Sequence, residues 1–144
     1  MRLVALRLLA RRDYAQAELC AALAARGFEA TPVAELATEL RAEGLLNEAR
    51  FAENYVSSHA ARGQGPVRIG AELRRAGVAE SLVESALGGG VDWHALARKV
   101  RAGKFGGEPP RDFRERARQA RFLQYRGFSA DHIRAATGAD PDTD

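Results

Sequence analysis

The stretch Leu123-Gln-Tyr-Arg-Gly-Phe128 occurs three times in this chain in degraded form. The other two copies are Leu23-Ala-Ala-Arg-Gly-Phe28 and Leu73-Arg-Arg-Ala-Gly-Val78, so the leucine and the glycine recur every 50 residues. A β-branched residue follows each copy at the same distance, at Val33, Val83 and Ile133. Self-similarity at a fixed period indicates one supersecondary unit that is used repeatedly along the chain.

Composition and periodicity predict helix along nearly the whole chain. Alanine, leucine, arginine and glutamate dominate, and β-branched and aromatic residues are few, which favours helices. No segment alternates between apolar and polar residues with a period of two, as a half-buried strand would. Helix start and stop residues divide the chain into nine helices in three groups of three. The predicted fold class is therefore all-α, an elongated array of three tandem three-helix repeats.

Charge is distributed unevenly over these repeats, which we assign to residues 1–46, 47–90 and 91–138, with residues 139–144 as a disordered acidic tail. The net charge is +3, and the first two repeats hold equal numbers of basic and acidic groups. Residues 92–137 hold eleven basic and five acidic groups. A basic final third indicates an acidic partner, either nucleic acid or an acidic protein surface. The alternative is a solvated face in an arginine-rich protein.

Capping residues predict several helix boundaries. N-caps are expected at three polar residues, Asn47, Asp92 and Ser129. Thr31-Pro32 is expected to start the third helix, with the hydroxyl at the N-cap and the proline at N1. A loose connector is expected from Gly103 to Pro110, followed by the longest basic helix of the chain, from Arg111 to Arg126.

The start of the second helix has an incomplete capping box. Glu18 is placed to reach back to the helix start, but its partner three residues earlier is Ala15, where a serine or threonine is expected. Asp13 is the alternative N-cap for this helix. Gly27 then supplies the left-handed residue that ends the helix.

The basic helix of the third repeat carries the main candidate contacts. Four arginines fall at i, i+3, i+7 and i+10 and form one stripe, namely Arg111, Arg114, Arg118 and Arg121. Like charges at such spacing repel by a few tenths of a kcal/mol per pair, so the stripe lowers stability unless an acidic group meets it. Asp112 and Glu115 offset only part of this repulsion. The neighbouring face is expected to be buried, with Phe113, Ala117 and Ala120.

Phe122 is a further candidate, because it aligns with Ala22 and Glu72, two positions that are expected to face solvent. It is either an exposed contact for a partner or a base, or a residue that packs on the end of the array. The other candidate contacts are cations around the basic helix and around the glycines of the second repeat, namely Arg62, Arg68, Arg75, Arg98, Lys99, Lys104 and Arg126.

Catalytic and metal-binding patterns are missing from the sequence. His59, His94 and His132 are far apart and none pairs with another at ligand spacing on a helix. Gly63-Gln-Gly65 lacks the third glycine and the preceding strand of a phosphate-binding loop. Cys20 is alone, so there is no disulfide framework and no zinc spacing. We expect no enzyme activity, no metal and no cofactor. With no targeting segment and no run of about 18 apolar residues, we expect no membrane association and a cytoplasmic location.

Four segments resemble the RecX family of proteins that regulate the bacterial recombinase RecA. They are Leu6-Arg-Leu-Leu-Ala-Arg-Arg12, Arg50-Phe-Ala-Glu-Asn-Tyr55, Arg62-Gly-Gln-Gly-Pro66 and Arg121-Phe-Leu-Gln-Tyr-Arg-Gly-Phe128. The likeness extends over nearly the whole chain. It implies an all-helical protein of three three-helix repeats, in agreement with the period of 50 residues.

The resemblance also implies a function. RecX proteins bind RecA and the RecA–DNA filament, limit filament extension, and suppress its ATPase, strand-exchange and co-protease activities. They thereby modulate homologous recombination, the SOS response and DNA repair, without being enzymes. Weak direct binding to single- or double-stranded DNA is a family trait, and we expect a monomer. The alternatives are a helical DNA-binding module that competes for single-stranded DNA, and a scaffold with another partner.

Some positions depart from the family pattern. Asn47 stands where the family usually has an acidic residue, and Ser57 and His59 stand where arginine is frequent. The second repeat is therefore less basic than usual, and the resemblance shifts the expected contacts toward the third repeat.

Overall fold

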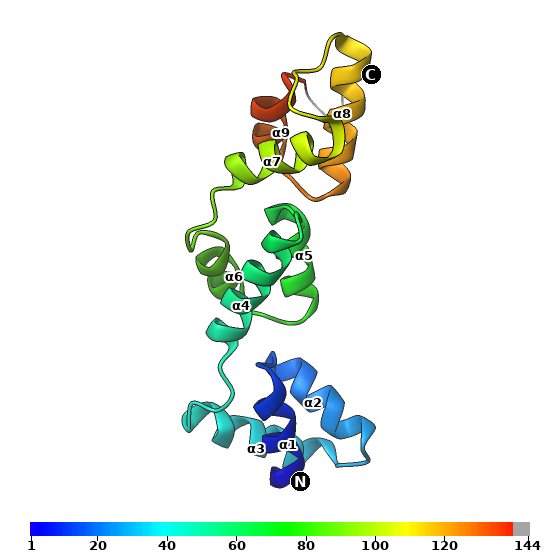
Figure 1. The fold of residues 1–144 in the computed structure, drawn as a ribbon. Helices are drawn as coiled ribbons and strands as arrows, with labels where there is room; N and C mark the ends of the chain where they lie inside the picture. Colours follow the sequence, from blue (N-terminus) through cyan, green and yellow to red (C-terminus); the bar gives the residue numbers. More distant parts are fainter. Residues whose placement is uncertain (140–144) are drawn as a thin grey trace. The chain divides into compact units, whose positions relative to one another are not determined.

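The computed structural model describes residues 1–139, which form nine α-helices and no strand in that range (Figure 1). The helices are α1 (Arg2–Arg11), α2 (Gln16–Ala25), α3 (Ala30–Ala42), α4 (Glu48–Ala61), α5 (Pro66–Arg75), α6 (Glu80–Leu87), α7 (Trp93–Phe105), α8 (Phe113–Tyr125) and α9 (Ala130–Thr137). The prediction of an all-α repeat protein is confirmed. The expected acidic tail lies outside the described residues from position 140 onward. Ala139 is buried, and its N–H donates to Oγ1 of Thr137.

The helices divide into two compact units that share the second repeat. The first unit holds Met1–Asn54 and Glu72–Ala86, which means α1 to α3, α6, the start of α4 and the end of α5. The second unit holds Tyr55–Ala71 and the described residues from Leu87 on, which means α7 to α9, the end of α4 and the start of α5. The contacts between consecutive repeats therefore lie inside these units.

The period of 50 residues is confirmed in the helices themselves. The second helix of each group ends at the same repeat position, at Ala25, Arg75 and Tyr125. The repeated leucine is buried each time, at Leu23, Leu73 and Leu123. The repeated glycine has a left-handed backbone each time, with φ of +90° at Gly27, +89° at Gly77 and +96° at Gly127. Each copy of the quoted stretch is thus the end of a helix and the turn that follows it.

Three of the expected N-caps are confirmed. Asn47 Oδ1 accepts from the N–H of Arg50 at 3.0 Å, and Asp92 Oδ1 accepts from the N–H of Ala95 at 3.0 Å. Ser129 Oγ accepts a longer bond from the N–H of His132, at 3.3 Å. These side chains satisfy backbone donors that the first turn of a helix leaves without an intrahelical partner.

Other boundaries were wrong, by two or more residues. Helix α3 begins at Ala30 with Glu29 as its N-cap, the same repeat position as Ser129, and places Thr31-Pro32 inside its first turn, where proline is tolerated. Helix α7 continues to Phe105, so Gly103 is helical and the connector starts at Gly106. Helix α8 runs from Phe113 to Tyr125, so it starts two residues after Arg111, and with 13 residues it is as long as the basic helix α7.

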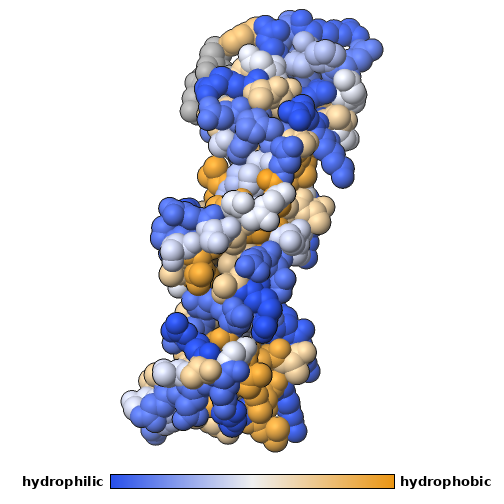
Figure 2. All heavy atoms as spheres, turned by 90° about the vertical axis from the view of Figure 1, so that its left-hand side faces the viewer, coloured by the Kyte–Doolittle hydropathy of each residue, from blue (hydrophilic) through white to orange (hydrophobic). Residues whose placement is uncertain are grey.

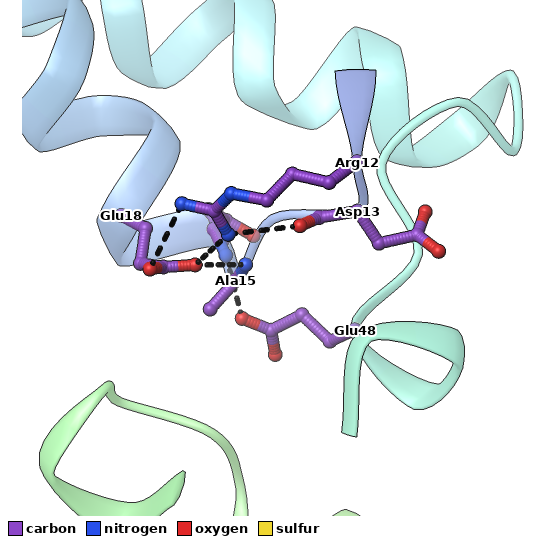
Figure 3. Close-up of polar contacts among 6 residues, drawn as sticks. Arg12, Asp13, Ala15, Glu18 and Glu48 are labelled. Atoms are coloured by element: carbon purple, nitrogen blue, oxygen red, sulfur yellow. Dashed lines mark hydrogen bonds and ion pairs between the residues drawn. The ribbon is translucent and has the colours of Figure 1, made fainter. Parts of the chain in front are cut away.

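The first junction, between the first and second repeats, is held by charged side chains. Asp13 does not cap α2. Its carboxylate lies 2.8 Å from Nη2 of Arg50 and accepts from Nδ2 of Asn54 at 3.0 Å, both on α4. The hydrogen bonds that Arg50 donates to Asp13, followed by the charge of that carboxylate, raise the pKa of Arg50 above its ordinary value. Glu48, also on α4, accepts from the N–H of Gln16 at 2.8 Å and so caps α2 from the neighbouring repeat (Figure 3).

Half of the expected capping box is present at this junction. Glu18 Oε1 accepts from the N–H of Ala15 at 3.1 Å, and the methyl group of Ala15 offers no acceptor in return. Arg12 Nη1 lies 3.2 Å from the same carboxylate oxygen (Figure 3). The Arg12 guanidinium also lies 3.8 Å from the ring centroid of Tyr14. The start of α2 is therefore stabilised by two glutamates, one from its own repeat and one from the next.

The second junction, between the second and third repeats, is held mainly by the backbone. The N–H of Gly65 donates to the carbonyl of Arg126 at 2.8 Å, and the N–H of Val67 donates to the carbonyl of Gly127 at 2.9 Å. A Cβ at Gly65 would lie 2.4 Å from the carbonyl carbon of Gly127, so only glycine permits this approach. The Arg126 guanidinium donates to the carbonyls of Arg62 and Gly63.

Candidate partner-binding face

The four predicted arginines of α8 and its N-terminal flank are all exposed. Arg111, Arg114 and Arg121 make no ion pair or hydrogen bond with any other residue of the part of the chain that the structure describes. Their guanidiniums are therefore available to an external acidic group.

Arg118 differs from the other three because it already has partners. Its Nη1 lies 3.2 Å from Oε2 of Glu115, and its guanidinium lies 5.2 Å from the ring centroid of Phe105. Asp112 is the N-cap of α8 and accepts from the N–H of Glu115 at 2.8 Å. Of the two acidic residues near the stripe, Glu115 pairs with one arginine, Arg118, and Asp112 caps the first turn of α8.

Phe113 was expected to be buried and is 47% exposed. Its neighbours Ala117 and Ala120 are buried, as expected. The first three residues of α8 have no helical counterpart in the second repeat, because α5 starts 50 residues before Arg116. Phe113 therefore belongs to an N-terminal extension of the helix, and its side chain is only partly covered. Its ring lines a shallow open hollow together with Arg114, Ala117 and Arg121.

Phe122 is half-buried and belongs to the packing of the third repeat. Its ring meets Phe105 of α7 edge to face, with centroids 5.4 Å apart, and Lys104 Nζ lies 5.7 Å from its centroid. The equivalent residues Ala22 and Glu72 are also half-buried, so the expectation that this position faces solvent was wrong. The exposed aromatic residues of α8 are Phe113 and Tyr125.

The remaining predicted contacts have different surroundings. The cations of α7 are exposed, namely Arg98, Lys99 and Lys104. Arg62 is exposed and Arg68 is half-buried in the second unit, whereas Arg75 is exposed in the first unit. Arg126 is half-buried and its guanidinium is bound to backbone carbonyls of the second junction. The guanidinium of Arg126 thus joins the third repeat to the second and is already occupied by these hydrogen bonds.

A buried polar pair, Arg101 and Gln119, was not predicted. Arg101 is 7% exposed and Gln119 is 3% exposed, with Nη1 of Arg101 donating to Oε1 of Gln119 at 3.2 Å. Arg101 also donates to the carbonyls of Gly106 and Glu108, each at 3.2 Å. It therefore holds the connector that leads into α8. The available signal was the repeat itself, because Gln119 occupies the position of Leu19 and Ile69.

Two histidines that are far apart in the sequence meet in the third repeat. The rings of His94 and His132 have centroids 4.5 Å apart, and Nδ1 of His132 lies 2.8 Å from Oγ of Ser129. Burial, followed by the neighbouring His94, lowers the pKa of His132 below its ordinary value. Among residues 1–139, no group of three or more histidine, cysteine, aspartate or glutamate side chains could hold a metal ion. No helix in the same range has the length and apolar character to cross a membrane.

Hydropathy also differs between the repeats. On the face drawn in Figure 2, the residues of the third repeat are mainly hydrophilic, whereas a group of hydrophobic residues is exposed on the first repeat. The structure is that of a helical repeat protein with a basic face on α8 that also carries exposed rings.

Comparison with known proteins identifies this class. Residues 47–87 match the second three-helix domain of RecX, and residues 92–137 match the third. The chain is 51% identical to the Regulatory protein RecX of Halorhodospira halophila, over 97% of this chain and 88% of that protein. It is 48% identical to the Regulatory protein RecX of Chromohalobacter salexigens, over 92% of this chain and 87% of that protein. The chain belongs to the RecX family.

A solved structure shows the same fold at lower sequence identity. The crystal structure of RecX from Lactobacillus salivarius superimposes with a TM-score of 0.80 and 21% sequence identity, covering 94% of this chain and 90% of that chain. The repeat architecture is thus common to both proteins.

Proposed function

We propose that this protein binds RecA and the RecA–DNA filament and limits filament extension. It thereby lowers the ATPase, strand-exchange and co-protease activities of the filament, and so modulates homologous recombination, the SOS response and DNA repair. It acts by occupying a surface and catalyses no reaction. It works as a cytoplasmic monomer, built from repeats at residues 1–46, 47–90 and 91–138.

Membership of the RecX family is the observation that carries this proposal, at 51% identity over 97% of the chain. The distribution of charge supports it, because a filament of protein and DNA offers acidic groups and the third repeat concentrates basic ones. Arg111, Arg114 and Arg121 are exposed and have no partner within residues 1–139. Several weak contacts on one filament add through effective concentration, so no single contact has to be strong.

The test is the single-strand-dependent ATPase of the cognate RecA, with this protein added in substoichiometric amounts and DNA in excess. We expect inhibition well below one molecule per RecA. The double variant Arg114→Ala/Arg121→Ala is expected to inhibit at least about tenfold less well, because each charged contact is worth about 1 kcal/mol or more in a desolvated interface.

The matched control is Arg7→Ala/Arg11→Ala. It removes the same charge from two exposed positions of α1, neither of which has a partner among the described residues. We expect it to inhibit like the wild type. Equal losses in both double variants would mean that net charge decides, and would contradict a specific role for α8.

The second candidate function is competition for single-stranded DNA without binding to RecA. The exposed arginines favour it as well, because they fit phosphate as well as carboxylate. Excess DNA separates the two functions: it relieves inhibition by a competitor for DNA, and leaves inhibition by a filament-binding protein in place. Steep loss of activity between low and physiological salt would also favour the competitor.

A further inference from the structure

We propose that the hollow beside Phe113 receives an unstacked base of a single-stranded nucleic acid, with Arg114 and Arg121 contacting the adjoining phosphates. This proposal rests on the proposed function, in which the protein acts on DNA-bound RecA, and it adds a binding position for one base and the residues that form it.

The residues around the hollow suit a flat, charged ligand. Phe113, Arg114, Ala117 and Arg121 line it; Ala117 is buried and the other three are exposed. These four residues fall within about two turns of α8 and share one face of the helix. Phe113 is 47% exposed, so part of its side chain is open to a ligand.

The chemistry of the hollow suits a base flanked by phosphates. An aromatic ring stacks on any base, because every base has a π-face. Guanidiniums bind phosphate through paired hydrogen bonds. Arg114 and Arg121 have no carboxylate or hydrogen-bond partner among residues 1–139, so binding a phosphate breaks no internal contact.

A second exposed ring lies further along the same helix. Tyr125 is 78% exposed and follows Phe113 by twelve residues, which is about 18 Å along the helix axis. The exposed arginines Arg114 and Arg121 lie between the two rings. Rings and cations thus follow one another along the exposed side of α8, as in proteins that bind single strands by stacking and charge.

A single strand fits this face better than a duplex or an acidic protein. In a duplex the base faces are covered by their neighbours and cannot stack on Phe113. A carboxylate-bearing peptide would use the guanidiniums but would leave the 47% exposed ring without a matching group. An unpaired strand offers flat faces and closely spaced negative charges in regular alternation along one chain.

The experiment measures binding of fluorescent oligonucleotides by anisotropy, with the full chain and without RecA. A twelve-residue oligothymidine is compared with an abasic strand that carries the same phosphates. We expect the wild type to bind the oligothymidine about fivefold to a hundredfold more tightly, the range of one stacked base.

Variants locate the stacked base. Phe113→Leu keeps an apolar side chain without a π-face, and Ala117→Leu fills the hollow without changing charge. Both are expected to lose the preference for bases and to retain the binding that the abasic strand shows. Leu3→Ala truncates another exposed apolar residue, on α1, and is expected to bind like the wild type. Urea midpoints equal to wild type show that the variants are folded.

Three results would overturn the proposal. They are equal affinity of the wild type for both strands, an unchanged preference in Phe113→Leu, and competition by polyglutamate as strong as by oligothymidine at equal charge, which would indicate an acidic protein partner instead. The ATPase titration is read separately. Inhibition of RecA without any preference for bases would contradict this binding site and support the proposed function. A preference for bases without inhibition of RecA would support the binding site and contradict the proposed function.

Discussion

The two junctions between repeats use the same repeat positions and different chemistry. At the first junction Ala15 and Ala17 of the α2 start lie in the same unit as the turn at Gly77, with Asp13 bound to Arg50 beside them. A Cβ added to Gly77 would lie 3.3 Å from Cβ of Ala17. At the second junction, Gly65 replaces alanine in the same repeat position as Ala15, and backbone hydrogen bonds replace the ion pair.

One methyl group accounts for this difference. The methyl of Ala15 is buried, so the backbone there cannot approach a neighbouring turn as closely as Gly65 does. Close approach gives the second junction two backbone hydrogen bonds of 2.8 and 2.9 Å, each worth about 0.5–1.5 kcal/mol net. Such bonds are insensitive to salt, whereas ion pairs near the surface are screened. The two junctions are therefore expected to respond differently to mutation and to salt.

The largest effect is expected from Gly127→Ala at the second junction. The new Cβ would lie 2.3 Å from Cβ of Arg68, which cannot move without moving the start of α5, and the residue has φ of +96°. We expect a loss of about 3–5 kcal/mol in the free energy of unfolding, from the left-handed backbone and from overpacking together. The measurement is urea unfolding, with hydrogen exchange of the Gly65 and Val67 amides as the local readout.

Gly27→Ala is the matched control for that variant. Gly27 has the same repeat position and φ of +90°, and a Cβ there would meet nothing within 4 Å. It is expected to lose only the backbone term, about 1–2 kcal/mol, with normal protection of the Gly65 and Val67 amides. Equal losses in the two variants would show that the close approach at the second junction contributes nothing to stability.

The helical repeat was predictable because it depends on local and periodic signals. The burial of Leu23, Leu73 and Leu123 and the positive φ of the glycines that follow are set within a few residues of each. The junctions were not predictable in this way. The role of Asp13 depends on Arg50, which is 37 residues away in the sequence. The residues next to Asp13 indicated an N-cap of α2 instead. Thr31-Pro32 gave a wrong start for α3 for a related reason. The helix starts at the repeat position that α9 also uses, with Glu29 as N-cap where α9 has Ser129.

At the first junction, Asp13→Asn is expected to have a smaller effect that depends on salt. The variant keeps the shape of the side chain and loses the charge that binds Arg50. We expect a lower urea midpoint than wild type at low salt, by less than half of the change in Gly127→Ala. The difference should shrink at about 1 M NaCl, where the Debye length is about 3 Å.

Glu80→Gln is the control for Asp13→Asn. It breaks the short pair of Glu80 with Arg74, at 2.7 Å, whose two residues flank the turn after α5 within one repeat. Because Arg74 lowers the pKa of Glu80, this pair too is charged near neutral pH. Exchange of the Gln16 amide, which donates to Glu48 at the first junction, should rise in Asp13→Asn and not in Glu80→Gln. A rise in both would mean that surface charge in general, and not the junction, sets this protection.

The candidate face was predictable as far as helix geometry reaches. Arg114, Arg118 and Arg121 are exposed on α8, as the spacing indicated. Arg111 is exposed too, but it precedes the helix, so the spacing does not place it on the stripe. The exposure of Phe113 was missed, because the helical pattern placed it with Ala117 and Ala120 and does not show that it is the first residue of α8. The pair of Arg101 and Gln119 was missed because two polar residues at helical spacing resemble a solvated face. Aligning Gln119 with the buried Leu19 and Ile69 would have exposed the contradiction.

The smallest effect is expected where the first junction lacks a hydroxyl. Ala15→Ser supplies the acceptor that would complete the capping box with Glu18, whose carboxylate already accepts from the Ala15 N–H at 3.1 Å. We expect a gain of about 0.5 kcal/mol in the free energy of unfolding, against a loss of about 1 kcal/mol for Ser129→Ala, which removes a cap that is present. Urea unfolding of both variants measures the difference. A loss in Ala15→Ser would mean that the first junction is packed around the alanine methyl as tightly as the second is around glycine. In that case the two junctions would differ in the type of polar contact that holds them, and both would be too tightly packed to accept an additional side-chain atom.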